Sequence, residues 1–361
     1  MKFGKKKAGA IAAGLSLVMA LSPVAAFAET PSVTKSLQVN EGSHVTATFA
    51  FNGEKKQLTD ENGNKTVGID DAAFPGITID SMAFTNATKG ANDAKSITLD
   101  KPFTHAGVYA WEVTETQNTY TGTGEMQYDV THYTVTATVT NAEGAEAVTG
   151  EHAAGLAVEW KVANKFDGKT SPDGADKSAD LSFTNKYTEP ADNDDKQDNG
   201  TLKITKKLDG KQADTTKDFS FKVTFTAPEV LPANTNAEQY LAAVTVNGET
   251  GKVVNGVATF TLKGGETATF GNLIAGTKYS VEETEVAGYE QGWKAVANGN
   301  EVTDKSGILI GENANSGEMT NKYKDVTPTG LVINNMPYIV MAGAAVAGVV
   351  AYGAAKRKLE Q

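Results

Sequence analysis

An internal duplication constrains this chain more than any other feature. Three short landmarks occur twice, in the same order, in the two halves of the 361-residue sequence. They are 33–37 (VTKSL) with 204–208 (ITKKL), 109–115 (YAWEVTE) with 279–283 (YSVEE), and 183–187 (FTNKY) with 319–323 (MTNKY). Repetition of this kind predicts two copies of one structural unit.

A polar run separates the two copies. Residues 189–200 (EPADNDDKQDNG) hold five acidic residues and no apolar side chain larger than Ala, which is typical of a solvated linker. The sequence therefore predicts a first domain at 29–188, an acidic linker at 189–200 and a second domain at 201–325.

Both halves have the pattern of β-strands. Segments such as 133–139 (YTVTATV) and 219–225 (FSFKVTF) alternate in polarity, and turn pairs such as Asn62-Gly63 and Asn247-Gly248 lie between segments of this kind. Helical periodicity is scarce, and one short helix is expected over 236–244. Many short strands with such turns predict an all-β chain of two tandem Ig-like β-sandwich domains.

Composition excludes several classes of function. The chain has no cysteine, so disulfides, thiol catalysis and zinc–thiolate sites are excluded. Its net charge is −11 and Arg357 is its one arginine, a poor composition for binding nucleic acid. The four histidines show no metal-ligand spacing, and no Gly-rich phosphate loop is present, so we expect neither a metal nor a cofactor.

The N-terminal residues have the pattern of an export signal. Residues 1–7 carry four lysines, residues 8–27 are mostly apolar, and Ala26-Phe27-Ala28 is a small-x-small cleavage site. This pattern predicts a signal peptide at 1–28, cut by signal peptidase between Ala28 and Glu29. A retained membrane anchor is the alternative.

The C-terminal residues 326–361 have three parts. Thr327-Pro328-Thr329-Gly330 precedes a mostly apolar stretch at 336–355, which is long enough for a transmembrane helix, and then a basic tail at 356–358. The arrangement resembles a Gram-positive cell-wall sorting signal of the LPXTG-like kind, although Thr327 stands where Leu is commonest. The resemblance implies that a sortase cuts between Thr329 and Gly330 and that the mature chain, 29–329, is attached to the cell wall.

Strand phase selects three side chains in each unit. Successive side chains of a strand face opposite ways, and the apolar face belongs to the core. This puts Lys35 and Lys206 inside, together with Glu115 and Glu283. The same counting buries the amides Asn185 and Asn321.

A buried lysine or glutamate needs a reason, because an unpaired ion in the interior costs several kcal/mol. The trio could form a buried salt bridge hydrogen-bonded to an amide, or its members could reach solvent at strand ends. It could also react. A desolvated, neutral lysine could attack the asparagine carboxamide, while the glutamate hydrogen-bonds the amide oxygen and passes the proton to departing ammonia.

The landmarks resemble those of streptococcal-type major pilins, which have tandem isopeptide-linkage domains of the CnaB type. The matching stretches include 107–115, 128–135 (YDVTHYTV) and 182–187 in the first unit, and 202–210 and 279–283 in the second. The resemblance implies bonds from Lys35 to Asn185, assisted by Glu115, and from Lys206 to Asn321, assisted by Glu283. Glu282 competes with Glu283 because the second unit has Val-Glu-Glu where the family usually has Val-Thr-Glu, and strand phase favours Glu283.

The same resemblance implies a structural role. The chain would be a backbone pilin subunit rather than an enzyme, with a single turnover of isopeptide formation in each domain. Its partners would be sortase, further copies of itself, accessory pilins and peptidoglycan. The lysine that joins subunits is expected near Lys177, with Lys169 and Lys165 as alternatives.

Two other classes of protein stay open at this point. A monomeric wall-anchored adhesin could use the same domains as a stalk. A secreted glycosidase would need Glu115 or Glu283 beside a second acid in an open cleft, and the apolar strand faces argue against that arrangement.

Overall fold

The computed structural model describes residues 30–178, 180–191 and 200–324. The predicted signal peptide with its cleavage site at Ala28 and Glu29 lies outside these residues, as does the predicted sorting segment with Thr327, Pro328, Thr329 and Gly330. Within the described ranges, no helix has both the length and the apolar character needed to cross a bilayer.

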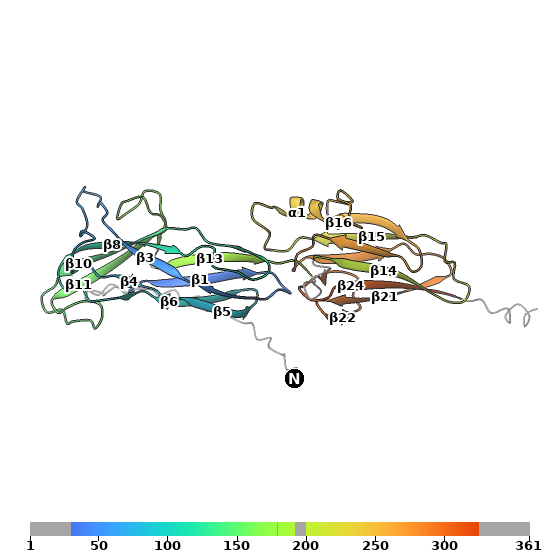
Figure 1. The fold of residues 1–361 in the computed structure, drawn as a ribbon, viewed down its shortest axis with the longest axis horizontal. Coiled ribbons are helices and arrows are strands. Elements are labelled where there is room, and N and C mark those ends of the chain that lie inside the picture. The colour runs from blue at the N-terminus through green and yellow to red at the C-terminus, as the bar shows by residue number, and fades with distance from the viewer. Residues whose placement is uncertain (1–29, 179, 192–199, 325–361) are drawn as a thin grey trace, which may run out of the picture.

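The first domain is built from strands β1 to β13 (Figure 1). A four-stranded sheet has the order β6-β1-β13-β9, a five-stranded sheet has the order β12-β11-β10-β8-β3, and β2-β5 and β4-β7 form two-stranded ribbons. The bounds are β1 Ser32–Val39, β2 Val45–Phe49, β3 Phe51–Lys56, β4 Ile77–Thr78, β5 Met82–Ala87, β6 Ala91–Ser96, β7 Thr98–Leu99, β8 Gly107–Glu115, β9 Glu125–Gln127, β10 Tyr133–Asn141, β11 Leu156–Ala163, β12 Lys177–Ser178 and β13 Leu181–Thr188.

The second domain is built from β14 to β24 and the short helix α1. Its sheets have the orders β16-β19-β14-β24-β21-β22 and β17-β18-β15-β20-β23. The bounds are β14 Leu202–Asp209, β15 Phe219–Thr226, α1 Ala237–Ala243, β16 Thr245–Val246, β17 Val253–Val254, β18 Val257–Leu262, β19 Thr267–Gly271, β20 Lys278–Glu283, β21 Tyr289–Ala297, β22 Asn300–Val302, β23 Ile308–Leu309 and β24 Ser316–Tyr323.

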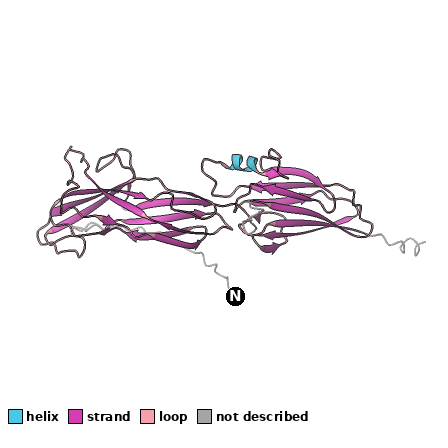
Figure 2. Ribbon diagram, viewed as in Figure 1, coloured by secondary structure: helices cyan, strands magenta, loops and turns pink. Residues whose placement is uncertain are grey.

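The prediction of an all-β fold is confirmed (Figure 2). The expected short helix is α1, which Asn236 caps by accepting a hydrogen bond from the backbone N–H of Gln239. Asn247 and Gly248 both have positive φ, as a tight turn of this composition requires. The alternating segments 133–139 and 219–225 lie in β10 and β15, as their pattern predicts.

The first and last strands of each domain are neighbours and run parallel. β1 pairs with β13 in the first domain, and β14 pairs with β24 in the second. Parallel neighbours need a long crossover, and here all the other strands of the domain together form it. The two ends of each domain's chain are therefore held in one pair of strands.

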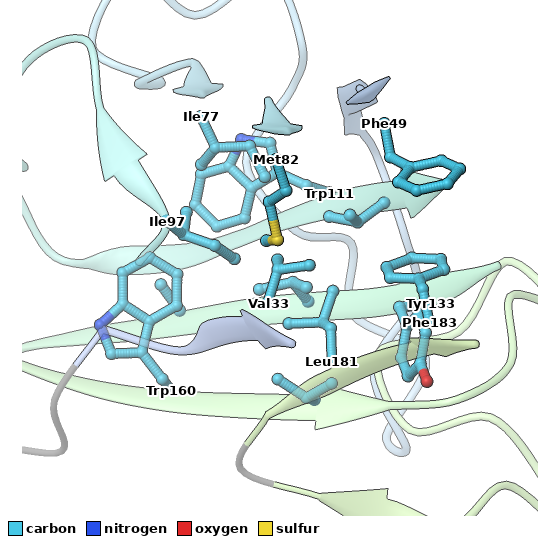
Figure 3. Packing of buried hydrophobic residues seen from close by; sticks show 14 of the residues in the cluster. Val33, Phe49, Ile77, Met82, Ile97, Trp111, Tyr133, Trp160, Leu181 and Phe183 are labelled. Atoms are coloured by element: carbon cyan, nitrogen blue, oxygen red, sulfur yellow. The ribbon is translucent and has the colours of Figure 1, made fainter. Parts of the chain in front are cut away.

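Each domain has a core between its two larger sheets. In the first, Trp111 of one sheet stacks on Trp160 with ring centroids 5.7 Å apart, and Val33 and Leu181 from the other sheet belong to the same cluster (Figure 3). A separate cluster forms the second core. Burial of side chains of this size stabilises each sandwich by about 1.5–3 kcal/mol per side chain.

The domains meet end to end through polar contacts (Figure 1). The buried Asn40 side chain donates to the carbonyl of Val230 (2.9 Å) and accepts from its N–H (2.8 Å). Gln127 donates to the carbonyl of Leu231 (2.8 Å), and Glu41 pairs with Lys278 (2.9 Å). Such contacts fix the relative placement of the two sandwiches.

Glu189, expected in a solvated linker, is buried at this junction. Its carboxyl group accepts hydrogen bonds from Ser43 and from the hydroxyl of Tyr187 (3.1 Å), and it adjoins the carboxyl of Glu312. His44 contacts Glu312 in turn, through Nδ1 (2.5 Å) and its backbone N–H (2.9 Å). Burial, together with the neighbouring carboxylate, raises the pKa of Glu189 to about 7.

This carboxyl pair makes stability depend on pH. Since folding raises the pKa of Glu189 from 4.5 to about 7, its contribution is complete below about 4.5 and is lost as the pH rises through about 7. We expect the free energy of unfolding to fall by up to about 3 kcal/mol across this range, measured by urea denaturation at several pH values. Glu189→Gln should remove that dependence and the exposed Glu41→Gln should keep it; equal pH profiles for wild type and Glu189→Gln would contradict the assignment.

Candidate functional site

The first candidate site lies between the two parallel end strands of the first domain. Lys35 sits in the middle of β1, opposite Phe183 of β13, and Asn185 follows two residues further along the same strand. Residues two apart on a strand share a face, so the Lys35 and Asn185 side chains both enter the core. Both residues are fully buried.

Glu115 reaches the same point from the opposite sheet. It is the last residue of β8, where it pairs with Phe51 of β3. Its Oε2 lies 2.7 Å from Lys35 Nζ, and its Oε1 accepts a hydrogen bond of 2.6 Å from Asn185 Nδ2. One carboxyl group therefore bridges the amine and the carboxamide.

Burial sets the electrostatics of this trio. The Lys35 and Glu115 side chains have 0% exposure, and the Phe49 ring lies 4.6 Å from Lys35 Nζ. Desolvation lowers the pKa of Lys35 against the opposing effect of Glu115, and desolvation raises the pKa of Glu115. The two pKa values approach each other, which makes transfer of a proton from the amine to the carboxylate easier.

The second domain repeats the arrangement. Lys206 Nζ lies 3.1 Å from Glu283 Oε2 and also donates to the carbonyl of Met319 (3.3 Å). Asn321 Nδ2 donates to Glu283 Oε1 at 2.5 Å. Lys206 and Asn321 are fully buried, and desolvation lowers the pKa of Lys206.

The correspondence extends to strand register and aromatic neighbours. Lys206 lies opposite Met319, two residues before Asn321, which is the offset that Lys35 has to Asn185. Phe219 covers Lys206 Nζ at 4.5 Å as Phe49 covers Lys35. The two copies of the unit thus share the strand offset and the aromatic neighbour of the lysine.

All six residues of the two trios are buried, as strand phase predicts. The positions of Glu282 and Glu283 also differ. The Glu282 side chain is 69% exposed and lies 3.5 Å from Lys222 on the surface. Glu283 is the carboxyl that reaches Lys206.

One expected contact is different. We expected the glutamate to hydrogen-bond the amide oxygen, but in both domains it accepts from the amide nitrogen. An ionised carboxylate has no proton to donate and pairs with N–H groups. The carboxyl is therefore placed beside the group that would leave, and the amide oxygen is left for another donor.

In the first domain that donor is a residue to which sequence reasoning gave no role. The backbone N–H of Asp129 donates to Asn185 Oδ1 at 2.8 Å. Asp129 lies within the stretch 128–135 that carried part of the family resemblance, but a backbone contact leaves no signature in side-chain pattern. Asn321 Oδ1 is buried and has no hydrogen-bond partner within the residues that the structure describes.

The candidate intersubunit lysines lie elsewhere, around the edge strand β12. Lys177 is exposed in β12 and its Nζ is 3.5 Å from the carbonyl of Pro172. Lys169 pairs with Asp173 (2.5 Å), which raises the Lys169 pKa. Lys165 donates to the Asp173 carbonyl (2.9 Å).

No group of three or more potential metal-binding side chains is found among the described residues. Each of the two trios supplies one amine, one carboxyl and one carboxamide. Chemically, this set suits attack of an amine on an amide.

Comparison with protein families covers both domains. Residues 31–188 match the family described as a Spy0128-like isopeptide-containing domain, FctA. Residues 200–323 match a domain of unknown function, DUF7601. The first match spans the strands that carry Lys35, Glu115 and Asn185.

Individual proteins agree with these matches. A curated protein of Streptococcus pyogenes serotype M1 named "Pilin" is 27% identical over 347 residues, covering 88% of each chain. Among solved structures, the major pilin from Streptococcus pyogenes is 22% identical, covers 81% of this chain and 98% of that chain, and has a TM-score of 0.34. The T3.2 major pilin of the same species is 18% identical, with coverages of 82% and 99% and a TM-score of 0.33.

The match of the first domain to the isopeptide-containing family and the sequence match to the curated protein show a chain of the pilin class. In particular, its first domain matches the Spy0128-like isopeptide-containing family, and the chain as a whole is similar to a streptococcal pilin. The resemblance predicted from the sequence landmarks is confirmed.

Adjacent glutamates offer a matched test of the second site. In an Asn321→Ala background, which has no carboxamide to react, Glu283→Gln leaves the Lys206 ammonium buried without its counter-ion. We expect the second domain to lose about 3–5 kcal/mol of unfolding free energy, followed through Trp293 fluorescence in urea. Glu282→Gln removes only a surface pair and should cost less than about 1 kcal/mol; similar losses for the two variants would contradict the site.

Proposed function

We propose that each domain closes itself with an isopeptide bond, from Lys35 to Asn185 in the first and from Lys206 to Asn321 in the second. The observation that carries the proposal is the duplicated buried trio, in which one carboxyl bridges amine and carboxamide at the same strand offset. A buried ion pair alone would satisfy the charges, but it would not account for the amide in both copies.

The reaction follows from the contacts of Glu115. Its Oε2 takes a proton from the Lys35 ammonium, which frees the amine lone pair to attack Cγ of Asn185. A C–N bond forms, and the carboxyl transfers protons from the attacking nitrogen to Nδ2, with which its Oε1 is in contact. The bond from Cγ to Nδ2 breaks, nitrogen leaves as ammonium, the carboxylate is restored, and a neutral amide replaces the buried ion. Glu283 does the same for Lys206 and Asn321.

The position of the bonds suits a fibre under tension. Load enters the second domain at β14 and leaves at β24, and these strands are neighbours. A covalent link between them carries the load past the hydrogen-bonded sheets. Closing a loop of this length also stabilises a domain by roughly 5 kcal/mol through the entropy of the unfolded chain, by analogy with disulfides.

Assembly and location extend the same proposal. The pilin is exported, held in the membrane by its C-terminal segment, and cut by sortase between Thr329 and Gly330. The Thr329 acyl group is then transferred to a lysine of the next subunit, and the finished fibre is attached to peptidoglycan, with accessory pilins as further partners. The chain is a substrate of these enzymes and itself acts once per domain.

Intact mass tests the bonds. The 29–329 fragment should be lighter than its sequence mass by two ammonia molecules, because each bond releases one. Lys35→Ala and Lys206→Ala should each restore the mass of one ammonia beyond the substitution itself, and Lys207→Ala, on the solvent face of β14, should restore none. A folded wild-type fragment with its full sequence mass would refute the bonds.

Lys177 is our proposed nucleophile for joining subunits. Among the described residues its Nζ contacts a carbonyl at 3.5 Å, whereas Lys169 is held by a carboxylate that raises its pKa and so keeps it protonated. A groove of about 460 Å³ beside Lys177, lined by Trp160 and Ser171, leaves room for an incoming peptide.

Ladders of covalent polymers test this assignment. On cells that express the matching sortase, wild-type chain should give high-molecular-mass ladders in cell-wall extracts. Lys177→Ala should abolish them, while Lys165→Ala and Lys169→Ala should keep them, since neither removes the attacking amine. Ladders that survive Lys177→Ala would move the role to another lysine. A wild type that is wall-attached but forms no ladder would favour a monomeric surface protein.

A further inference from the structure

The two sites differ at the carbonyl oxygen that must carry negative charge during the reaction. In the first domain Asn185 Oδ1 accepts the N–H of Asp129 at 2.8 Å. In the second domain Asn321 Oδ1 is buried and has no partner among the described residues. A tetrahedral intermediate places a full charge on this oxygen, so a donor there matters more in the transition state than in the ground state.

Sheet topology explains the difference. In the first domain β9 pairs with β13 only from Lys186 to Thr188. The loop that follows β9 lies along the edge of β13 beside Asn185. In the second domain β21 pairs with β24 from Ser316 to Tyr323 without a break. A continuous antiparallel strand uses its N–H groups in the ladder, so none is released to reach a side-chain oxygen.

The Asp129 side chain holds its own N–H in place. Its carboxylate accepts hydrogen bonds from the backbone N–H of Thr184 (2.7 Å), the residue before Asn185, and of Thr131 (2.9 Å). The Asp129 carbonyl accepts from the Gln117 side chain (2.9 Å). The loop is thereby attached to β13 on one side and to the segment after β8 on the other.

We infer that the backbone N–H of Asp129 is an oxyanion donor for closure of the first domain and that the Asp129 carboxylate is its positioning group. We infer also that the second domain closes more slowly, because no donor contacts Asn321 Oδ1 in the part of the chain that the structure describes. The inference rests on the proposed bond chemistry and adds a specific catalytic group to it. Loss of one such donor lowers a rate by about 10²–10³ in other acyl-transfer sites.

The test follows both bonds in one chain during cell-free synthesis of the 29–329 fragment. Samples are quenched with acid at intervals and digested, and mass spectrometry gives the fraction of each domain that has lost ammonia. In the wild type, we expect the first domain to close at least about ten times faster than the second. The second domain serves as an internal reference for every variant.

Two variants isolate the donor. Asp129→Ala releases the loop and should slow first-domain closure at least about tenfold, with second-domain closure unchanged. Asp60→Ala is its matched control, because Asp60 also accepts two backbone N–H groups, those of Asn62 and Asn64, in an exposed loop. Replacing the backbone amide of residue 129 by an ester removes the N–H and keeps the carboxylate, and it should slow the first domain by about a hundredfold; an ester at Asn62 is its control.

The possible outcomes distinguish the role of the Asp129 N–H from the formation of the isopeptide bonds themselves. Selective slowing of the first domain by Asp129→Ala and by the ester supports the inference. Closure that is insensitive to both changes, or a wild type whose second domain closes as fast as the first, overturns the inference and leaves the proposed bonds intact. Absence of ammonia loss from either folded wild-type domain overturns the bond chemistry and the inference together.

Discussion

The contact on which this structure depends is that of a buried amine with a buried carboxyl, held between the first and last strands of each sandwich. Either ion alone would cost several kcal/mol in such an interior. Each is tolerated because the strand register puts the lysine and the asparagine on one face: the lysine lies opposite the residue two positions before the asparagine. The glutamate reaches them from the opposite sheet. The parallel pairing of the end strands therefore defines the topology of each domain and also positions the lysine and the asparagine of each trio.

Much of this was predictable from sequence because the signals are local. Alternation of polarity gave the strands and the direction of Lys206 against Lys207, and it distinguished Glu283 from Glu282 by a single residue. Duplication then made each assignment in one half a check on the other. Successive side chains of a strand point to opposite faces. A register that buries the apolar residues therefore also fixes which charged residues of the strand face the core and which face solvent.

What the sequence missed are contacts between residues that share no local pattern. Glu189 looked like part of an acidic solvated run, yet it is buried against Ser43, Tyr187 and Glu312 where the domains meet. The Asp129 contact involves a backbone N–H, which every residue other than proline has. The glutamates were expected at the amide oxygen and lie at the amide nitrogen, because an ionised carboxylate can only accept.

Pulling on single molecules tests the central claim most directly. With handles at residues 30 and 324, two closed domains should stretch without any unfolding step from the segments between Lys35 and Asn185 or between Lys206 and Asn321, because load passes through the covalent links. Extension in two large steps, of about 500 Å and about 400 Å for fully released segments at up to about 3.6 Å per residue, would show that the trios are only ion pairs and would contradict the account.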